Sequence, residues 1–487
     1  MIVLTENEYR DDDFTITKNG RNFILKEYKG NDTIVIVPNY VTVIGENAFY
    51  KNKDIVKVII KEGVTKIENC AFYCCNKLEY IEIPTTLKVI EGAVFYFCKN
   101  LKEIKLNDGL TEIGFASFQG CLKLTKLELP DTLVYIGEDA FLNCSDLKFN
   151  VYDNAKYLGG KTNPYLYLFK VVRTNIKSCK IHNDTKFIGS ESFKFCSNLD
   201  EIIIPNGVKR IGNSAFCYCT KIERINIPDS VVFIGNSAFS NCDNLLSVNL
   251  PSNLNNINDS LFCNSGKLET VVIPDNVKTI ERLAFSYCEN LKSIKLSKNL
   301  EILNYWVFSN CKKLDYVEIP KDIKTIDNYA FEDCEQLNIT YYGNMYFHSF
   351  EKSLNSIYAP NIPLNSISPN QKEKYIEGFF KNYNDIKNMD AENFKRYLKY
   401  IKTNRIKYYD AFNENVCKFM VENKIIKLEE VDALIKKTTY SNHIELSAML
   451  LDYKNKNFSS EEIEKQIEKD LFEEKIISFS NLKSLWI

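Results

Sequence analysis

The chain has 487 residues, of which 45% are hydrophobic and 26% are charged. This composition is typical of globular proteins and excludes a disordered chain or one embedded in a membrane. The 62 basic and 64 acidic residues nearly cancel, so the net charge provides no general attraction for nucleic acid or an anionic membrane surface.

The N-terminal residues MIVLTENEYRDDDF combine a short apolar start with acidic residues, which differs from a secretory signal peptide. No run of about eighteen apolar residues occurs, so the sequence predicts no membrane span. We therefore expect a cytoplasmic protein in which the 16 cysteines are free thiols.

The main feature of the sequence is a repeat of 23 residues. Phenylalanine recurs with this spacing in two series: Phe49, Phe72, Phe95, Phe118 and Phe141, then Phe193, Phe216, Phe239, Phe262, Phe285, Phe308 and Phe331. A cysteine follows three residues after ten of them: Cys75, Cys98, Cys121, Cys144, Cys196, Cys219, Cys242, Cys288, Cys311 and Cys334. A proline precedes eight of them by eleven residues. Such a period indicates a repeat architecture.

One unit, CCNKLEYIEIPTTLKVIEGAVF, shows how each repeat folds. Its Ile-Glu-Ile alternation predicts a short strand with one buried face, which the following proline ends. The later Ile-Gly-x-x-Ala-Phe segment is predicted to turn the chain, because glycine allows a backbone that larger residues resist. Each unit therefore forms one coil, and coils bury their apolar sides by stacking with their strands parallel.

The pattern L-x-x-I-x-I-P-x-x-V-x-x-I-G-x-x-A-F-x-x-C, over about residues 14–342, resembles the BspA-like family of leucine-rich repeats. The resemblance implies an α/β solenoid of short parallel strands, which we assign to residues 1–350. It also implies protein binding, because the best known members of the family are similar to surface adhesins that bind host or partner proteins.

Two segments depart from the repeat. Phe141 and Phe193 lie 52 residues apart, which is two periods plus six. The Gly159-Gly160 pair and the alternating run from Tyr165 to Phe169 predict a hairpin-like island inserted at about residues 150–180. The first unit, residues 14–38, lacks the cysteine and is predicted to cap the N-terminal edge.

The C-terminal part loses the repeat. Residues 351–370 contain three prolines and are predicted to be a linker. Residues 371–487 are predicted to form an all-α domain of five or six helices in hairpins, with a weak similarity to ankyrin-like helical pairs. The expected helix signals are Asp390 with Glu392, a face of Leu428, Val431, Leu434 and Ile435, a face of Ile444, Ser447, Ala448 and Leu451, and a Ser459–Glu462 capping box that opens a last helix.

The sequence contains no recognisable catalytic, cofactor or metal site. The cysteines recur at one turn position, which favours buried packing, and no cysteine pair has zinc-binding spacing. The three histidines, His182, His348 and His443, are scattered, and the glycines form no nucleotide-binding motif. We therefore predict no cofactor and no metal.

The exposed face of the predicted strands is the remaining candidate. It mixes both charge signs with aromatic residues, which suits a protein partner better than a nucleic acid. The candidate partner-binding residues are Lys57, Tyr80, Glu82, Glu103, Lys105, Lys126, Glu128, Arg224, Asn226, Tyr316 and Glu318. The leading hypothesis is a non-enzymatic protein–protein interaction scaffold.

Two alternatives remain open. The protein could be a surface adhesin or a secreted effector that is exported without a standard signal peptide. It could also be an enzyme with its activity in the C-terminal helices, for example around Asp410, Glu414 and His443.

Overall fold

The computed structural model describes residues 2–5, 8–11, 13–343, 354, 356–369, 371–383, 389–409, 413–466 and 469. The chain divides into two compact units: Met1–Leu337 with Phe347–Ser353, called here the solenoid unit, and Asn338–Tyr346 with Leu354–Ile487, called the helical unit. Within the described ranges, no helix is long and apolar enough to cross a membrane.

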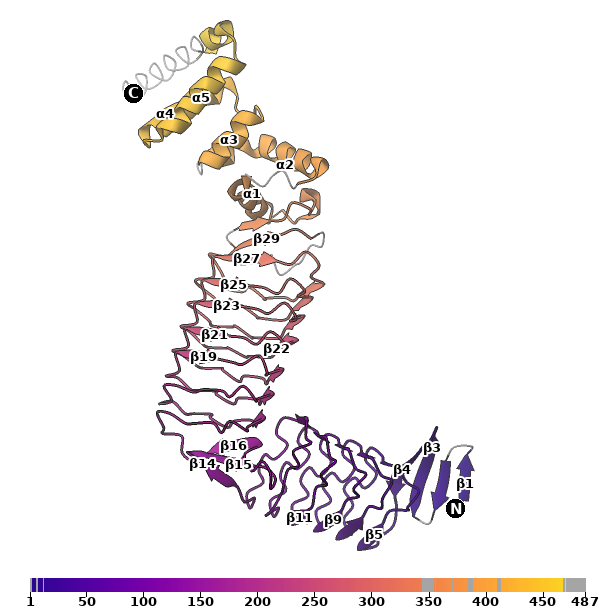
Figure 1. Cartoon of the computed structure of the whole chain (residues 1–487). Helices are drawn as coiled ribbons and strands as arrows, with labels where there is room; N and C mark the ends of the chain where they lie inside the picture. Colours follow the sequence, from indigo (N-terminus) through magenta and orange to yellow (C-terminus); the bar gives the residue numbers. More distant parts are fainter. Residues whose placement is uncertain are drawn as a thin grey trace, which may run out of the picture. The chain divides into compact units, whose positions relative to one another are not determined.

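The solenoid unit consists of stacked coils, as predicted (Figure 1). Each coil contributes a first strand and, after a turn, a short second strand, and both pair in parallel with the equivalent strands of neighbouring coils. Partners are one period apart, as in Val58 with Ile81 and Ile44 with Ile67. The register therefore repeats the sequence period and keeps the same side chains buried in every coil.

Before the island, the first strands are β5 (Ile34–Ile36), β7 (Lys57–Ile59), β9 (Tyr80–Glu82) and β11 (Glu103–Ile104). The second strands there are β6 (Val43–Ile44), β8 (Lys66–Ile67), β10 (Val89–Ile90), β12 (Glu112–Ile113) and β13 (Tyr135–Ile136). After the island, the first strands are β19 (Arg224–Asn226), β21 (Ser247–Asn249), β23 (Thr270–Val272), β25 (Ser293–Lys295) and β27 (Tyr316–Ile319). The second strands there are β17 (Phe187–Ile188), β18 (Arg210–Ile211), β20 (Phe233–Ile234), β22 (Asn256–Ile257), β24 (Thr279–Ile280), β26 (Ile302–Leu303) and β28 (Thr325–Ile326).

Four antiparallel strands cap the N-terminal end, and two of them, β3 and β4, fall within the predicted capping unit of residues 14–38. They are β1 (Ile2–Thr5), β2 (Glu8–Asp11), β3 (Phe14–Asn19) and β4 (Asn22–Tyr28). Only the last of them joins the stack, because β4 pairs in parallel with β6. The cap thus extends the sheet of second strands, whereas the sheet of first strands ends at β5.

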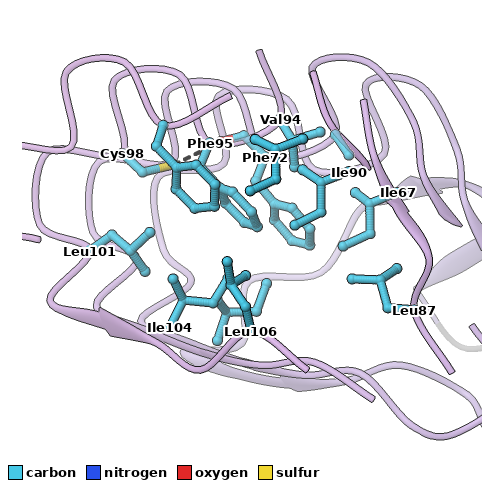
Figure 2. Close-up of a cluster of buried hydrophobic side chains, with 14 of the residues drawn as sticks. Ile67, Phe72, Leu87, Ile90, Val94, Phe95, Cys98, Leu101, Ile104 and Leu106 are labelled. Atoms are coloured by element: carbon cyan, nitrogen blue, oxygen red, sulfur yellow. Dashed lines mark hydrogen bonds between the residues drawn. The ribbon is translucent and has the colours of Figure 1, made fainter. Parts of the chain in front are cut away.

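The repeat phenylalanines form one buried column inside the coils (Figure 2). Neighbouring rings stack with their centroids 4.7 Å apart for Phe49 and Phe72 and 5.9 Å apart for Phe118 and Phe141. At the island the column changes, because Phe141 meets the edge of Tyr167 instead of another phenylalanine. The column resumes at Phe193 and continues to Phe331.

Nine of the ten repeat cysteines share a specific hydrogen-bonding role. The Cys98 thiol donates to the carbonyl oxygen of Phe72 at 3.0 Å, one coil earlier (Figure 2). Eight further cysteines make the same bond, and Ser265 makes it with its hydroxyl. Burial raises the pKa of the Cys75 thiol to about 12, which keeps the donating proton in place. The described cysteines are free thiols.

The prediction that the repeat glycines adopt a backbone conformation closed to larger residues is wrong. Glycines such as Gly212 do not have positive φ; they are needed because a Cβ there would lie 2.5 Å from the Ser190 backbone nitrogen of the neighbouring coil. The left-handed residues instead lie two before and two after each phenylalanine, as at Asn47 (φ 61°) and Lys51 (φ 56°). Backbone hydrogen bonds to the next coil, such as Lys51 N to Tyr73 O at 2.8 Å, hold these conformations in non-glycine residues.

The predicted island is confirmed as an antiparallel insertion. β14 (Asn150–Tyr152) pairs with β15 (Ala155–Leu158), which pairs with β16 (Tyr167–Val171). The last of these strands returns to the stack, because β16 pairs in parallel with β17. The insertion interrupts both sheets of the solenoid unit.

The helical unit begins earlier than the sequence suggested. Within it, β29 (Asn338–Tyr341) pairs in parallel with β30 (Ser356–Tyr358), and η2 (Leu364–Ser366) follows. The segment 351–370 was expected to be a linker, but Ile357, Tyr358 and Ile362 are buried in it. The prolines of this segment occur between packed residues. Composition alone cannot distinguish such a packed segment from an exposed linker.

The helices of this unit are α1 (Lys372–Lys381), α2 (Ala391–Asn404), η4 (Arg405–Tyr409), α3 (Glu414–Glu422), α4 (Leu428–Tyr440) and α5 (Ile444–Asn457). Residues 460–466 are also helical. The two predicted N-terminal signals are confirmed: the Asp390 carboxylate accepts from Glu392 N and Asn393 N, and Ser459 and Glu462 form the capping box. The end of the predicted last helix lies outside the described residues.

One predicted helix face is wrong. Helix α5 buries Leu446, Leu450 and Tyr453, whereas Ile444 is 73% exposed and Leu451 is 51% exposed. Apolar residues lie on both sides of this helix, so the sequence period does not select one face. Packing against α4 and α3 makes the selection.

Candidate functional site

The exposed face of the first strands has the orientation that the sequence predicts. Ten of the eleven candidate residues are exposed, and Lys57 is half-buried. Their neighbours Val58, Ile81 and Ile104 point into the core. The alternation along a strand is the physical reason, since successive side chains leave opposite faces. Their role in partner binding stays a prediction.

The structure brings seven of the eleven candidates together on four neighbouring coils. Lys57, Tyr80, Glu103 and Lys126 follow one another in register across the sheet. We call the seven residues the charged row: Lys57, Tyr80, Glu82, Glu103, Lys105, Lys126 and Glu128. The other four lie apart from it beyond the island, with Arg224 and Asn226 on β19 and Tyr316 and Glu318 on β27.

Interactions within the charged row hold opposite charges side by side. Lys57 pairs with Glu82 at 2.5 Å, and Lys126 pairs with Glu128 at 3.0 Å. The hydrogen bond from Lys126, helped by Lys161 and Lys105, lowers the pKa of Glu128. The same bond raises the pKa of Lys126. Both groups therefore carry their charges at neutral pH.

A groove of about 630 Å³ opens at the island end of the charged row. Residues from two coils and from the island loop line it: Glu103, Ile104, Lys105, Leu106, Asp108, Lys126, Glu128, Leu129, Pro130, Asp131, Thr132, Gly160, Lys161 and Thr162. We call it the island groove. Four of its lining residues belong to the charged row, and its volume lies within the range of ligand-binding clefts.

The island loop forms one wall of this groove through backbone contacts. Leu129 N donates to Gly159 O at 3.3 Å. In an ordinary coil the equivalent amide donates to the next coil, as Ile60 N does to Glu82 O. A Cβ at Gly160 would lie 2.7 Å from Leu129 O, so only glycine allows this approach. The Thr162 hydroxyl donates to the Asp131 carboxylate.

The sequence did not place these island residues in a site. The Gly159-Gly160 pair signalled a turn, but the partners of this turn lie about thirty residues away along the chain. Asp108, Asp131 and Lys161 therefore join the candidate site from the structure alone.

Two of the three residues named for a possible enzymatic activity lie within the described residues. Glu414 is the first residue of α3 and pairs with Lys418, whereas His443 immediately precedes α5. Asp410 and His348 lie outside the described residues. His182 stacks on Tyr165 in the island region with ring centroids 4.0 Å apart. Among the residues that the structure describes, no group of three or more His, Cys, Asp or Glu could hold a metal ion.

Comparison with protein families identifies the repeat. The BspA type leucine rich repeat region matches residues 27–148, 165–292, 256–361 and 280–412, in six copies. These matches cover well over half of the chain. The chain belongs to the BspA-type leucine-rich repeat family. The predicted resemblance and the solenoid fold are thereby confirmed.

Solved structures of bacterial leucine-rich repeat proteins are similar to this BspA-type chain. A leucine rich cell surface protein from Faecalibacterium prausnitzii is 23% identical with a TM-score of 0.33, and the match covers 70% of this chain and 96% of that one. A leucine-rich repeat protein from Bacteroides ovatus is 25% identical with a TM-score of 0.34, and the match covers 73% and 91%. The pneumococcal vaccine antigen PcpA is 19% identical with a TM-score of 0.32, and the match covers 72% and 98%. The comparison with curated proteins found no match.

Proposed function

We propose that this BspA-type protein is a non-enzymatic scaffold that binds a partner protein along the charged row and in the island groove. The observation that carries the proposal is the juxtaposition of four charged side chains with the island loop. The charges alternate in sign along and between two adjacent coils, which carry Glu103, Lys105, Lys126 and Glu128. These side chains line a groove that Gly160–Thr162 closes on one side.

The charges of the groove favour specificity over indiscriminate adhesion. A wrong partner would leave one sign facing the same sign, which costs several kcal/mol across an interface. A polyanion such as nucleic acid would meet the carboxylates of Glu103, Asp108, Glu128 and Asp131 together with the lysines. The expected partner therefore presents both charge signs to the groove.

The test uses two exchanges of charge that leave the net charge unchanged. The Glu103→Lys, Lys126→Glu double variant exchanges two of the four groove charges, which puts like charges side by side at positions 103 and 105 and at positions 126 and 128. The Glu289→Lys, Lys312→Glu variant is the control, because this pair is also exposed and also spans adjacent coils. A partner is captured with the full-length wild-type chain and identified by mass spectrometry, and its dissociation constant is then measured for each variant.

We expect the groove variant to bind at least about tenfold more weakly, which corresponds to about 1.4 kcal/mol. The control should bind like the wild type. Both variants should unfold within about 0.5 kcal/mol of the wild type, as surface substitutions do. Equal affinity of the groove variant and the wild type would contradict the proposal.

A further inference from the structure

Strand β5 is the free edge of the sheet of first strands. The order of this sheet is β11-β9-β7-β5, so β5 has β7 on one side only. The N-terminal cap does not cover its other side, because β1 to β4 belong to the sheet of second strands (Figure 1). Within the described part of the chain, the cap therefore closes one of the two sheets.

The backbone groups of β5 divide between its two sides. Thr33 O accepts from Val56 N and Lys57 N at 2.8 and 2.9 Å, and Val37 N donates to Ile59 O at 3.0 Å. Alternate residues of a strand direct their N–H and C=O groups to opposite neighbours. The amide and carbonyl groups of Ile34 and Ile36 therefore point away from β7, with the spacing that another extended chain would match.

The side chains along this edge are apolar and exposed. Ile34 is 58% exposed and Ile36 is 53% exposed. In the parallel register, Ile34 lies beside Lys57 and Ile36 lies beside Ile59. Lys57 is in turn the neighbour of Tyr80, so the apolar edge is adjacent to the charged row. Charged side chains and prolines often protect natural edge strands, and the three residues Ile-Val-Ile of β5 include neither.

We propose that β5 binds an extended strand of a partner protein by strand addition. This inference rests on the proposed scaffold function and gives it a binding mode. Main-chain groups of β5 would supply the affinity, and apolar residues at alternate positions of the added strand would pack beside Ile34 and Ile36. A three-residue edge suits a short strand better than a second copy of this chain, since a stable dimer buries about 1,200 Å² or more.

The experiment measures the binding of a fluorescein-labelled peptide, Lys-Thr-Ile-Thr-Val-Thr-Ile-Thr-Lys, to the full chain by fluorescence anisotropy. Ile36→Pro removes an N–H that points away from β7, so the bonds between β5 and β7 remain. Ile36→Thr is the matched control, because threonine keeps the N–H and favours strands. A peptide with prolines in place of its three apolar residues is the control ligand.

We expect Ile36→Pro to weaken peptide binding at least about tenfold and Ile36→Thr to weaken it less. The Glu103→Lys, Lys126→Glu variant should bind the peptide like the wild type. Hydrogen exchange across residues 33–37 should slow when the peptide is added to the wild type, which provides a readout if the proline variant does not fold.

Three results would overturn the inference. They are equal binding by the wild type and Ile36→Pro, equal binding of the proline-containing peptide, and a dimer of the full chain that Ile36→Pro dissociates, which would make a second copy the occupant. A separate outcome is that the wild type does not bind the peptide while the Glu103→Lys, Lys126→Glu variant still binds the captured partner more weakly than the wild type. In that case the edge inference is wrong and the scaffold function stands.

Discussion

The coils before the island and the coils after it share an interior and differ on their surfaces. Both groups have the phenylalanine column and the thiol-to-carbonyl bond, as in Cys98 to Phe72 and Cys311 to Phe285. On the face of the first strands, the coils before the island have the charged row. After it, neutral residues such as Asn226, Asn249 and Thr270 prevail.

The residue after each phenylalanine also differs between the two regions. In the first three coils before the island it is Tyr50, Tyr73 and Tyr96, whose rings stack on one another. After the island the equivalent residues include Cys217 and Ser240, which are buried. The phenylalanine column is therefore common to both regions, whereas the position that follows each phenylalanine differs between them.

The largest expected effect tests the shared interior. Replacing Phe72 or Phe239 by alanine should destabilise the chain by about 3 to 5 kcal/mol, because each ring is buried between two others. Urea unfolding of the two variants measures the loss. If one variant unfolds like the wild type, the two regions do not share the same kind of core.

A smaller effect is expected where the two regions meet. Arg210 on β18 pairs with Glu138 at 2.5 Å, and its guanidinium lies 3.8 Å from the centre of the Phe233 ring and 4.6 Å from that of Tyr135. Both charged side chains are about 15% exposed. Arg210→Ala should cost about 2 to 3 kcal/mol, somewhat less than the loss of about 3 to 5 kcal/mol for a fully buried pair, because both side chains keep some exposure.

The exposed pair of Arg282 and Asp259 is the control for this variant. Arg282→Ala should cost less than about 1 kcal/mol, as exposed ion pairs do. Hydrogen exchange should accelerate around residues 135–143 and 187–192 in Arg210→Ala only. Equal stability of the two variants would show that Arg210 does not join the coils across the island.

The smallest effect concerns the thiols. Burial raises the pKa of the Cys75 thiol from 9.0 to about 12. The unfolded chain therefore loses this proton first, so the stability that depends on it is complete below about pH 9 and decreases as the pH rises toward 12. Unfolding in urea at pH 8 and at pH 10.5 measures the decrease.

The matched variant is Cys75→Ser, since Ser265 makes the equivalent bond with a hydroxyl at 3.0 Å. It should cost about 1 kcal/mol at neutral pH, because serine keeps the hydrogen bond but buries a hydroxyl in place of the less polar thiol. Its stability should also fall less than that of the wild type between the two pH values. An equal fall would mean that the Cys75 thiol does not titrate as proposed.

Much of the solenoid could be predicted because its interactions repeat with the sequence period. The alternation in the unit around Ile81 placed Tyr80 and Glu82 on the exposed face, and the structure confirms their exposure. The island groove could not be predicted, because Gly160 and Asp131 meet through an insertion that breaks the period. The cytoplasmic location, the absence of enzymatic activity and the partner role of Arg224 and Tyr316 stay predictions.

The sequence by itself determined the coil, its buried phenylalanine and cysteine, and the outward direction of the charged row, because each follows from local alternation repeated at a fixed spacing. Only the tertiary structure decided which carbonyl each thiol binds, which face of α5 is buried, and that β5 is left as a free edge. Those features depend on which segments become neighbours in space, and residue spacing along one chain does not specify that.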